Sequence, residues 1–175
     1  MDDRADPLHD SLTYLLFELM RLARRTGARM FPGRPRLPQL LVLACAARHG
    51  PLSQREVAER LRMDPGDLVG IVDALEDAGH VRRRRDPDDR RRYALEATED
   101  GRLALGASLG ERVHLDEQLF EPLSPDERRL FKDLILRVLA HHDLRFAPSG
   151  GHSPDPCTPG RDIGAGTGGH DRTSP

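Results

Sequence analysis

The chain has 175 residues, which suits one domain with a tail, and its 27 basic and 29 acidic residues leave a net charge of −2. That balance excludes a uniformly basic coat for nucleic acid, and the longest apolar run, residues 40–47, is too short to cross a bilayer. The first residues lack the apolar core of a signal peptide, and two cysteines make no disulfide framework. We therefore expect a cytoplasmic protein with no membrane partner.

The first predicted element is an amphipathic helix within residues 8–30. Its apolar residues recur at helical spacing, at Leu12, Leu15, Leu16, Leu19, Leu22 and Ala23. Prolines at 32 and 35 interrupt the pattern, and a second, apolar helix is predicted from Leu37 to about Gly50.

Two short helices with clear start signals are predicted next. Ser53 and Glu56 form a capping box, in which each side chain bonds the other residue's amide. Asp64 followed by Pro65 marks the start of another helix, which ends near Gly79. Two adjacent capped helices of this length predict a helix-turn-helix.

An arginine-rich β-hairpin is predicted directly afterwards. Residues 81–85 and 91–97 read as strands, and the Asp-Pro-Asp-Asp sequence at 86–89 reads as the turn. Residues 82–92 carry seven arginines and three aspartates, so this segment has a charge of +4 and the rest of the chain has a charge of −6. Guanidinium groups on such a ribbon suit a polyanion, and the plain alternative is a solvated charge run in a surface loop.

Two further helices and a tail complete the chain. Thr98 is expected to cap a helix through Phe120, and Ser124 a last helix to about residue 146. From residue 147 on, 12 of 29 residues are glycine or proline, which predicts a disordered tail. We expect Cys157 to be exposed in that tail and Cys45 to be a buried, unreactive thiol on the second helix.

In this order and spacing, the chain resembles the MarR family of bacterial transcriptional regulators. The matching residues are the sequence 52–58 (Leu-Ser-Gln-Arg-Glu-Val-Ala), the sequence 75–83 (Leu-Glu-Asp-Ala-Gly-His-Val-Arg-Arg), the hairpin with Asp89 and Arg91, and Thr98-Glu99-Asp100-Gly101. The resemblance implies a mainly α winged helix-turn-helix with a small β-hairpin wing and long terminal dimerisation helices. It implies an N-terminal dimerisation helix in 1–36, a DNA-binding lobe in 37–97, C-terminal dimerisation helices in 98–146 and a tail in 147–175.

The resemblance also implies roles for residues of the wing. Arg91 is expected to enter the minor groove, while Asp89 either directs an arginine or only forms the turn. Arg90 is expected to meet phosphate or solvent, and Arg85 lies on the strand before the turn.

The expected recognition helix carries an unusual set of residues. Its accessible N-terminal part offers Pro65, Gly66, Asp67, Val69 and Gly70, with no Arg, Lys, Asn or Gln for bidentate base contacts. Either Val69 touches thymine methyls and Asp67 accepts from cytosine, or the helix supplies shape and the wing supplies affinity. We expect a mixture, and therefore a strong salt dependence of binding to double-stranded DNA.

The outer helices have apolar stripes larger than a winged core can cover. Packing across a two-fold axis would form a homodimer, and the alternative is a monomer whose helices fold back on its own lobe. The residues expected at the interface are Leu12, Leu15, Leu16, Leu19, Leu134, Ile135 and Val138.

The family further implies repression and a small-molecule effector, often phenolic or acidic, bound between the dimerisation helices and the DNA-binding lobe. Four arginines at 21, 24, 25 and 29 could serve an anionic effector or could be solvated. No cofactor is expected, and the histidines lack metal-ligand spacing. No catalytic motif indicates an enzyme. The second hypothesis is a winged helix that binds protein, as an adaptor or anti-activator, and a salt series would separate the two.

Overall fold

The computed structural model describes residues 8–85, 93–147 and Cys157, and it is mainly helical with a small antiparallel sheet. The winged helix-turn-helix architecture predicted from the sequence is confirmed. The elements in chain order are α1 (Leu12–Met30), α2 (Leu37–His49), β1 (Leu52–Ser53), α3 (Gln54–Leu61), α4 (Pro65–Asp77), β2 (Val81–Arg85), β3 (Tyr93–Ala97), α5 (Glu99–Leu119), α6 (Pro125–His142) and the 3₁₀ turn η1 (Leu144–Phe146).

Side-chain caps fix where most of the helices begin. The Tyr14 amide donates to the Ser11 hydroxyl over 3.3 Å, so α1 starts at Leu12, inside the predicted range 8–30. The predicted capping box at α3 is present, since the Ser53 amide donates to the Glu56 carboxylate over 2.8 Å and the Glu56 amide to the Ser53 hydroxyl over 3.2 Å. Thr98 and Ser124 cap α5 and α6, also as predicted, by accepting from the amides of Gly101 and Glu127.

The sheet has one strand more than the sequence indicated. Its order is β1-β3-β2, and the two-residue β1 pairs Leu52 with Leu95 of β3. Strand β1 is too short to show an alternating pattern, so it could not be predicted from the sequence. The described part of the second hairpin strand, Tyr93–Ala97, lies within the predicted 91–97.

One hydrophobic core lies inside the lobe formed by α2, α3, α4 and the sheet. Its fully buried aliphatic side chains are Val42, Leu43, Val57, Leu68, Val72, Leu75, Val81 and Leu95. The start of α5 is fastened to this lobe, because the Thr98 hydroxyl donates to the Gly79 carbonyl over 2.6 Å. Gly101 is required there, since a Cβ would lie 2.0 Å from the His80 carbonyl oxygen.

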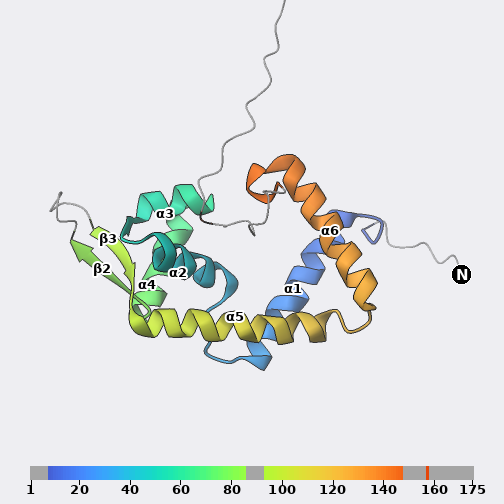
Figure 1. The fold of residues 1–175 in the computed structure, drawn as a ribbon, viewed down its shortest axis with the longest axis horizontal. Coiled ribbons are helices and arrows are strands. Elements are labelled where there is room, and N and C mark those ends of the chain that lie inside the picture. The colour runs from blue at the N-terminus through green and yellow to red at the C-terminus, as the bar shows by residue number, and fades with distance from the viewer. Residues whose placement is uncertain (1–7, 86–92, 148–156, 158–175) are drawn as a thin grey trace, which may run out of the picture.

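Helix α5 leads away from the winged lobe toward α1 and α6 (Figure 1). Because α1 and α6 lie at the far end of α5, their apolar stripes are left without cover from the winged lobe. Within the described residues, no helix is both long enough and apolar enough to span a membrane.

Cys45 is buried as predicted, but the expectations that it is a free thiol and that Cys157 is exposed were wrong. Cys157 is only 2% exposed, and it is bonded to Cys45, which is fully buried in α2. The glycines and prolines around Cys157 suggested exposure, but the cysteine side chain itself is apolar and packs into the core. The rest of the predicted tail lies outside the described residues.

Candidate nucleic-acid interface

The turn between α3 and α4 sets the geometry of the helix-turn-helix. Arg62 takes a left-handed conformation with φ of 53°, which ends α3, and the Met63 amide then donates to the Ala58 carbonyl over 3.0 Å. The Asp64 carboxylate accepts from the amides of Gly66 at 2.8 Å and Asp67 at 3.3 Å. The first turn of α4 is therefore held rigidly at the surface.

All five residues predicted for DNA reading on α4 are exposed. They are Pro65, Gly66, Asp67, Val69 and Gly70. Val69 is 47% exposed, whereas its neighbour Leu68 is 1% exposed and belongs to the core. The helix therefore separates a core face from an outward face, and the predicted residues lie on the outward one.

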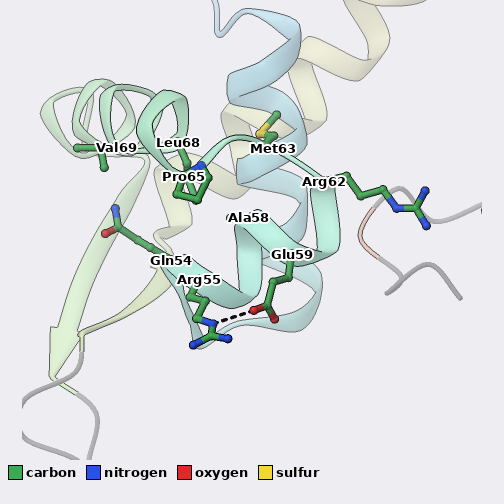
Figure 2. A pocket seen from close by; sticks show the side chains of 9 residues that line it. All are labelled: Gln54, Arg55, Ala58, Glu59, Arg62, Met63, Pro65, Leu68 and Val69. Carbon is green, nitrogen blue, oxygen red and sulfur yellow. Dashed lines mark hydrogen bonds and ion pairs between the residues drawn. The ribbon is translucent and has the colours of Figure 1, made fainter. Parts of the chain in front are cut away.

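A hollow of about 640 Å³ adjoins this face, between α3 and the start of α4. Figure 2 shows Gln54 and Arg55 on α3 opposite Val69 and Pro65 on α4. Arg55 is paired with Glu59 at 2.8 Å, and the hydrogen bond to Glu59 raises the pKa of the Arg55 guanidinium. The full lining is Gln54, Arg55, Ala58, Glu59, Arg62, Met63, Pro65, Leu68 and Val69.

The contribution of α3 to this surface was missed by sequence reasoning, which used Gln54 and Arg55 only as parts of a capped helix. The capping box did place both at the exposed N-terminal turn of α3. That turn was the available signal, because helix N-termini present free amides to anions such as phosphate.

The wing arginines fall into two groups. Arg82 pairs with Glu96 across the hairpin at 2.8 Å, and Arg83 pairs with two carboxylates of α4. Arg84 and Arg85 are exposed and show no ion pair with any described residue. Two of the four guanidiniums on β2 are therefore held by carboxylates, and two remain for an external anion.

Arg83 joins the wing to the recognition helix. Its Nη2 lies 2.5 Å from Asp73 Oδ1, its Nη1 binds Glu76, and its backbone amide donates to Glu76 Oε1 over 3.2 Å. The hydrogen bond to Asp73 raises the pKa of Arg83, which stays charged at every ordinary pH. The ion pair with Arg83 offsets the negative charge of Asp73 on α4.

Three predicted wing residues, Asp89, Arg90 and Arg91, lie outside the described residues, so their roles stay predictions. Arg85, the fourth, is the last residue of β2 and lies opposite Tyr93 of β3.

The residues predicted for dimerisation lie on α1 and α6, at the far end of α5 from the wing (Figure 1). All are exposed except Leu19, which is half-buried. The same helices expose further large apolar side chains that the sequence analysis did not name: Phe17, Met20, Leu130 and Leu139.

The comparisons with known sequences point to one family. The sequence pattern of the MarR family matches residues 36–93. The chain is 33% identical over 126 residues to the transcriptional repressor NicR of Pseudomonas putida, covering 69% of this chain and 80% of NicR. It is 32% identical over 94 residues to the uncharacterized regulator YfiV of Bacillus subtilis, covering 53% of this chain and 58% of YfiV.

The match to the regulator TtmR of Methylorubrum extorquens is 42% identical over 65 residues, covering 37% of this chain. The chain thus spans little more than half of YfiV and a third of TtmR.

Solved structures of similar fold support the same assignment. The crystal structure of MarR is 27% identical, with a TM-score of 0.65 over 81% of this chain and 94% of that one. PcaV of Streptomyces coelicolor, solved with its natural ligand, is 28% identical with a TM-score of 0.65, over 77% and 95% of the two chains. CouR, a repressor bound to a 23-mer DNA duplex, shares the fold at 24% identity, with a TM-score of 0.67 over 79% of this chain and 99% of that one. Because a third of the residues are identical across four-fifths of NicR, and the helix-turn-helix and wing match the family pattern, this chain belongs to the MarR family of winged-helix transcriptional regulators.

Proposed function

We propose that this protein is a transcriptional repressor that binds a pseudo-palindromic DNA operator as a homodimer. The observation that carries the proposal is the rigid coupling of two exposed surfaces by Arg83. One is the first turn of α4, and the other is the hairpin with the unpaired Arg84 and Arg85. A helix of this kind suits the major groove, and arginines beside it suit phosphate or the minor groove.

The charge distribution supports directed rather than general DNA binding. The chain carries a net −2, while residues 82–92 carry seven arginines. Arg83 offsets one of the two negative charges of Asp73 and Glu76, which reduces the acidic charge on α4. Approach of DNA is then favoured at the wing and opposed elsewhere on the body.

The homodimer is supported by the uncovered apolar faces of α1 and α6. Large apolar side chains rarely remain exposed in such numbers on a monomer, and pairing two such faces would bury them. Two winged lobes related by a two-fold axis would read half-sites about one helical turn, or ~10 base pairs, apart.

Repression and release by a small phenolic or acidic compound are supported only by analogy. NicR is named a repressor, and PcaV was solved with its natural ligand. We place the effector between the winged lobe and the dimerisation helices, without assigning residues to it.

Fluorescence anisotropy with the intergenic DNA beside the protein's own gene, over a salt series, tests this proposal. We expect saturable binding that exceeds binding to random DNA and falls steeply with salt, because each phosphate contact contributes about 0.9 to the slope of log K against log salt. Arg85→Ala and Arg91→Ala should each weaken binding and lower that slope.

Arg129→Ala on α6 is the matched control, because Arg129 is an exposed arginine paired with Asp126, remote from the wing. It should behave as the wild type. Binding unaffected by both wing substitutions would contradict the proposal.

The second candidate is a protein-binding adaptor or anti-activator, favoured by the exposed Val69 beside the partly apolar hollow. An apolar contact of this kind would be insensitive to salt. Absence of DNA affinity at low salt would make this second candidate the better account.

A further inference from the structure

The disulfide between Cys45 and Cys157 joins the core of the winged lobe to a segment far along the chain. These are the only two cysteines in the sequence, they lie 112 residues apart, and their Cα atoms are 5.3 Å apart. Cys45 sits in the middle of α2 with no exposed surface, and Cys157 is 2% exposed. The family pattern ends at residue 93, so nothing in that match concerns Cys157.

The C-terminal end of α3 makes polar contacts with Cys157 and with the residues that follow α6. Arg60 Nη1 donates to the Cys157 carbonyl oxygen over 3.4 Å, and Arg145 Nη1 donates to the Arg60 carbonyl oxygen over 3.1 Å. Arg62 Nη1 lies 3.5 Å from Asp143 Oδ2. Two separate pieces of chain after α6 therefore meet one turn of α3, directly before the recognition helix.

These contacts engage two arginines at the end of α3, and one of them, Arg62, borders the candidate DNA surface. Arg62 lines the hollow that Val69 and Pro65 also line. Figure 2 shows its side chain extending out of the hollow, away from Val69. With Asp143 beside it, the Arg62 guanidinium is partly neutralised and directed away from the surface that would face DNA.

We propose that Cys45 and Cys157 form a reversible redox pair, and that their disulfide weakens DNA binding by holding Cys157 against the end of α3. In the disulfide form, the Cys157 carbonyl holds Arg60. In the dithiol form Cys157 leaves α3, and the Arg60 guanidinium reaches a phosphate. The inference rests on the proposed DNA-binding function.

The oxidant class that balances this reaction is a hydroperoxide. The Cys157 thiolate attacks the peroxide, so an S–O bond forms, the O–O bond breaks, and an alcohol or water leaves after taking up a proton. The Cys45 thiolate then attacks the sulfenic sulfur, so the S–S bond forms and hydroxide leaves, to be protonated to water. Cys157 reacts first, because it leaves α3 in the dithiol form while Cys45 stays in the core.

A dithiol reverses the change. One of its thiolates attacks a protein sulfur and forms a mixed disulfide, and its second thiolate displaces the other protein thiol. The two electrons pass from the dithiol to the protein pair, which returns to two thiols.

The test uses the full chain, treated either with hydrogen peroxide or with dithiothreitol. Alkylation by N-ethylmaleimide and intact mass spectrometry count the free thiols, and anisotropy of the same samples gives the affinity for operator DNA. We expect no free thiols and about two- to threefold weaker binding after peroxide, because one phosphate contact is lost. Cys157→Ser should bind like the reduced wild type and ignore peroxide. Cys45→Ser is a second variant, and Cys157→Ser alone carries the test if that core substitution fails to fold.

Each other outcome is decisive. A disulfide that forms without changing DNA affinity, or that tightens binding, would overturn the regulatory role. Two alkylated thiols after peroxide, in a protein that binds DNA, would overturn the redox pair. A disulfide in a protein that binds no DNA in either state would refute the proposed function and the regulation together, while leaving the redox chemistry in place.

Discussion

Arg83 of β2 and Asp73 of α4 form an ion pair, with Nη2 and Oδ1 2.5 Å apart, that fastens the wing to the recognition helix. Glu76, one turn further along α4, binds the same guanidinium. A planar guanidinium that spans two carboxylates fixes direction as well as distance. The angle between the helix and the hairpin, and hence the fit to two neighbouring grooves, depends on this one side chain.

Replacing Arg83 with methionine should weaken operator binding without changing its salt slope, because Arg83 positions the wing and does not itself touch phosphate. The loss of the partly exposed ion pairs should lower the free energy of unfolding by about 1 kcal/mol. Anisotropy over a salt series and urea denaturation measure the two effects. Arg82→Met is the matched control on the same strand, since among the described residues Arg82 pairs with Glu96 within the hairpin. A salt slope reduced by about one in Arg83→Met would mean direct phosphate contact.

Val69 and Leu68 give a sharp test of which face of α4 reads DNA. Val69→Ala should leave stability nearly unchanged, because the side chain is 47% exposed, and should reduce the preference for operator over random DNA. Leu68→Ala should instead destabilise the lobe by about 2–5 kcal/mol, because Leu68 is buried in the core. Thermal unfolding and competition binding distinguish them. A Val69→Ala protein with undiminished preference for operator would remove Val69 from base recognition.

Acid should weaken the ion pairs that Asp143, directly after α6, forms with Arg145 and Arg62. The hydrogen bond from the Arg145 side chain, with help from Arg62, lowers the pKa of Asp143 to about 2. Because the folded pKa lies below the unfolded value of about 3.9, the stabilisation is complete above that value and is lost as pH falls toward 2. Asp143→Asn should therefore be less stable than the wild type at pH 6, and the gap should close toward pH 2. Melting curves across that range would contradict the pairing if the gap stayed constant.

The apolar face of α6 should be required for dimerisation. Val138→Asp places a charge on a side chain that is 61% exposed in the isolated chain but would be buried between two copies. Sedimentation velocity should show a monomer for this variant and a dimer for the wild type. Val69→Asp, at an exposed valine (47%) on the winged lobe, is the matched control and should remain dimeric. A dimeric Val138→Asp protein would place the interface elsewhere.

The sequence allowed prediction of the parts of the fold that depend on local signals. The caps at Ser53, Asp64 and Ser124, and the apolar spacing between them, gave the helices nearly to the residue. Strand β1 was not predicted, because its two residues form a strand only through pairing with β3. That pairing is a tertiary contact, and no local pattern records it.

The position of the candidate DNA-binding surface was predicted from the sequence, but the ion pairs that join it to the wing were not. The five exposed residues at the start of α4 could be read from the helical period and the cap. Arg83 binds Asp73 and Glu76 instead of pointing toward DNA. This arrangement depends on the angle between β2 and α4, which cannot be read from a run of charged residues. The burial of Cys157 was missed for a similar reason, since composition describes a segment's average tendency and not the one side chain that finds a place in the core.

Hydroxyl-radical footprinting of the wild-type protein on the intergenic DNA beside its gene tests whether a dimer binds an operator. We expect two protected patches about one helical turn apart, related by two-fold symmetry, with minor-groove protection outside each from the wings. Arg91→Ala should lose the outer protection and keep the inner patches at higher protein concentration. A single patch, or protection that spreads evenly along any DNA, would contradict a dimer that reads an operator through two recognition helices and two wings.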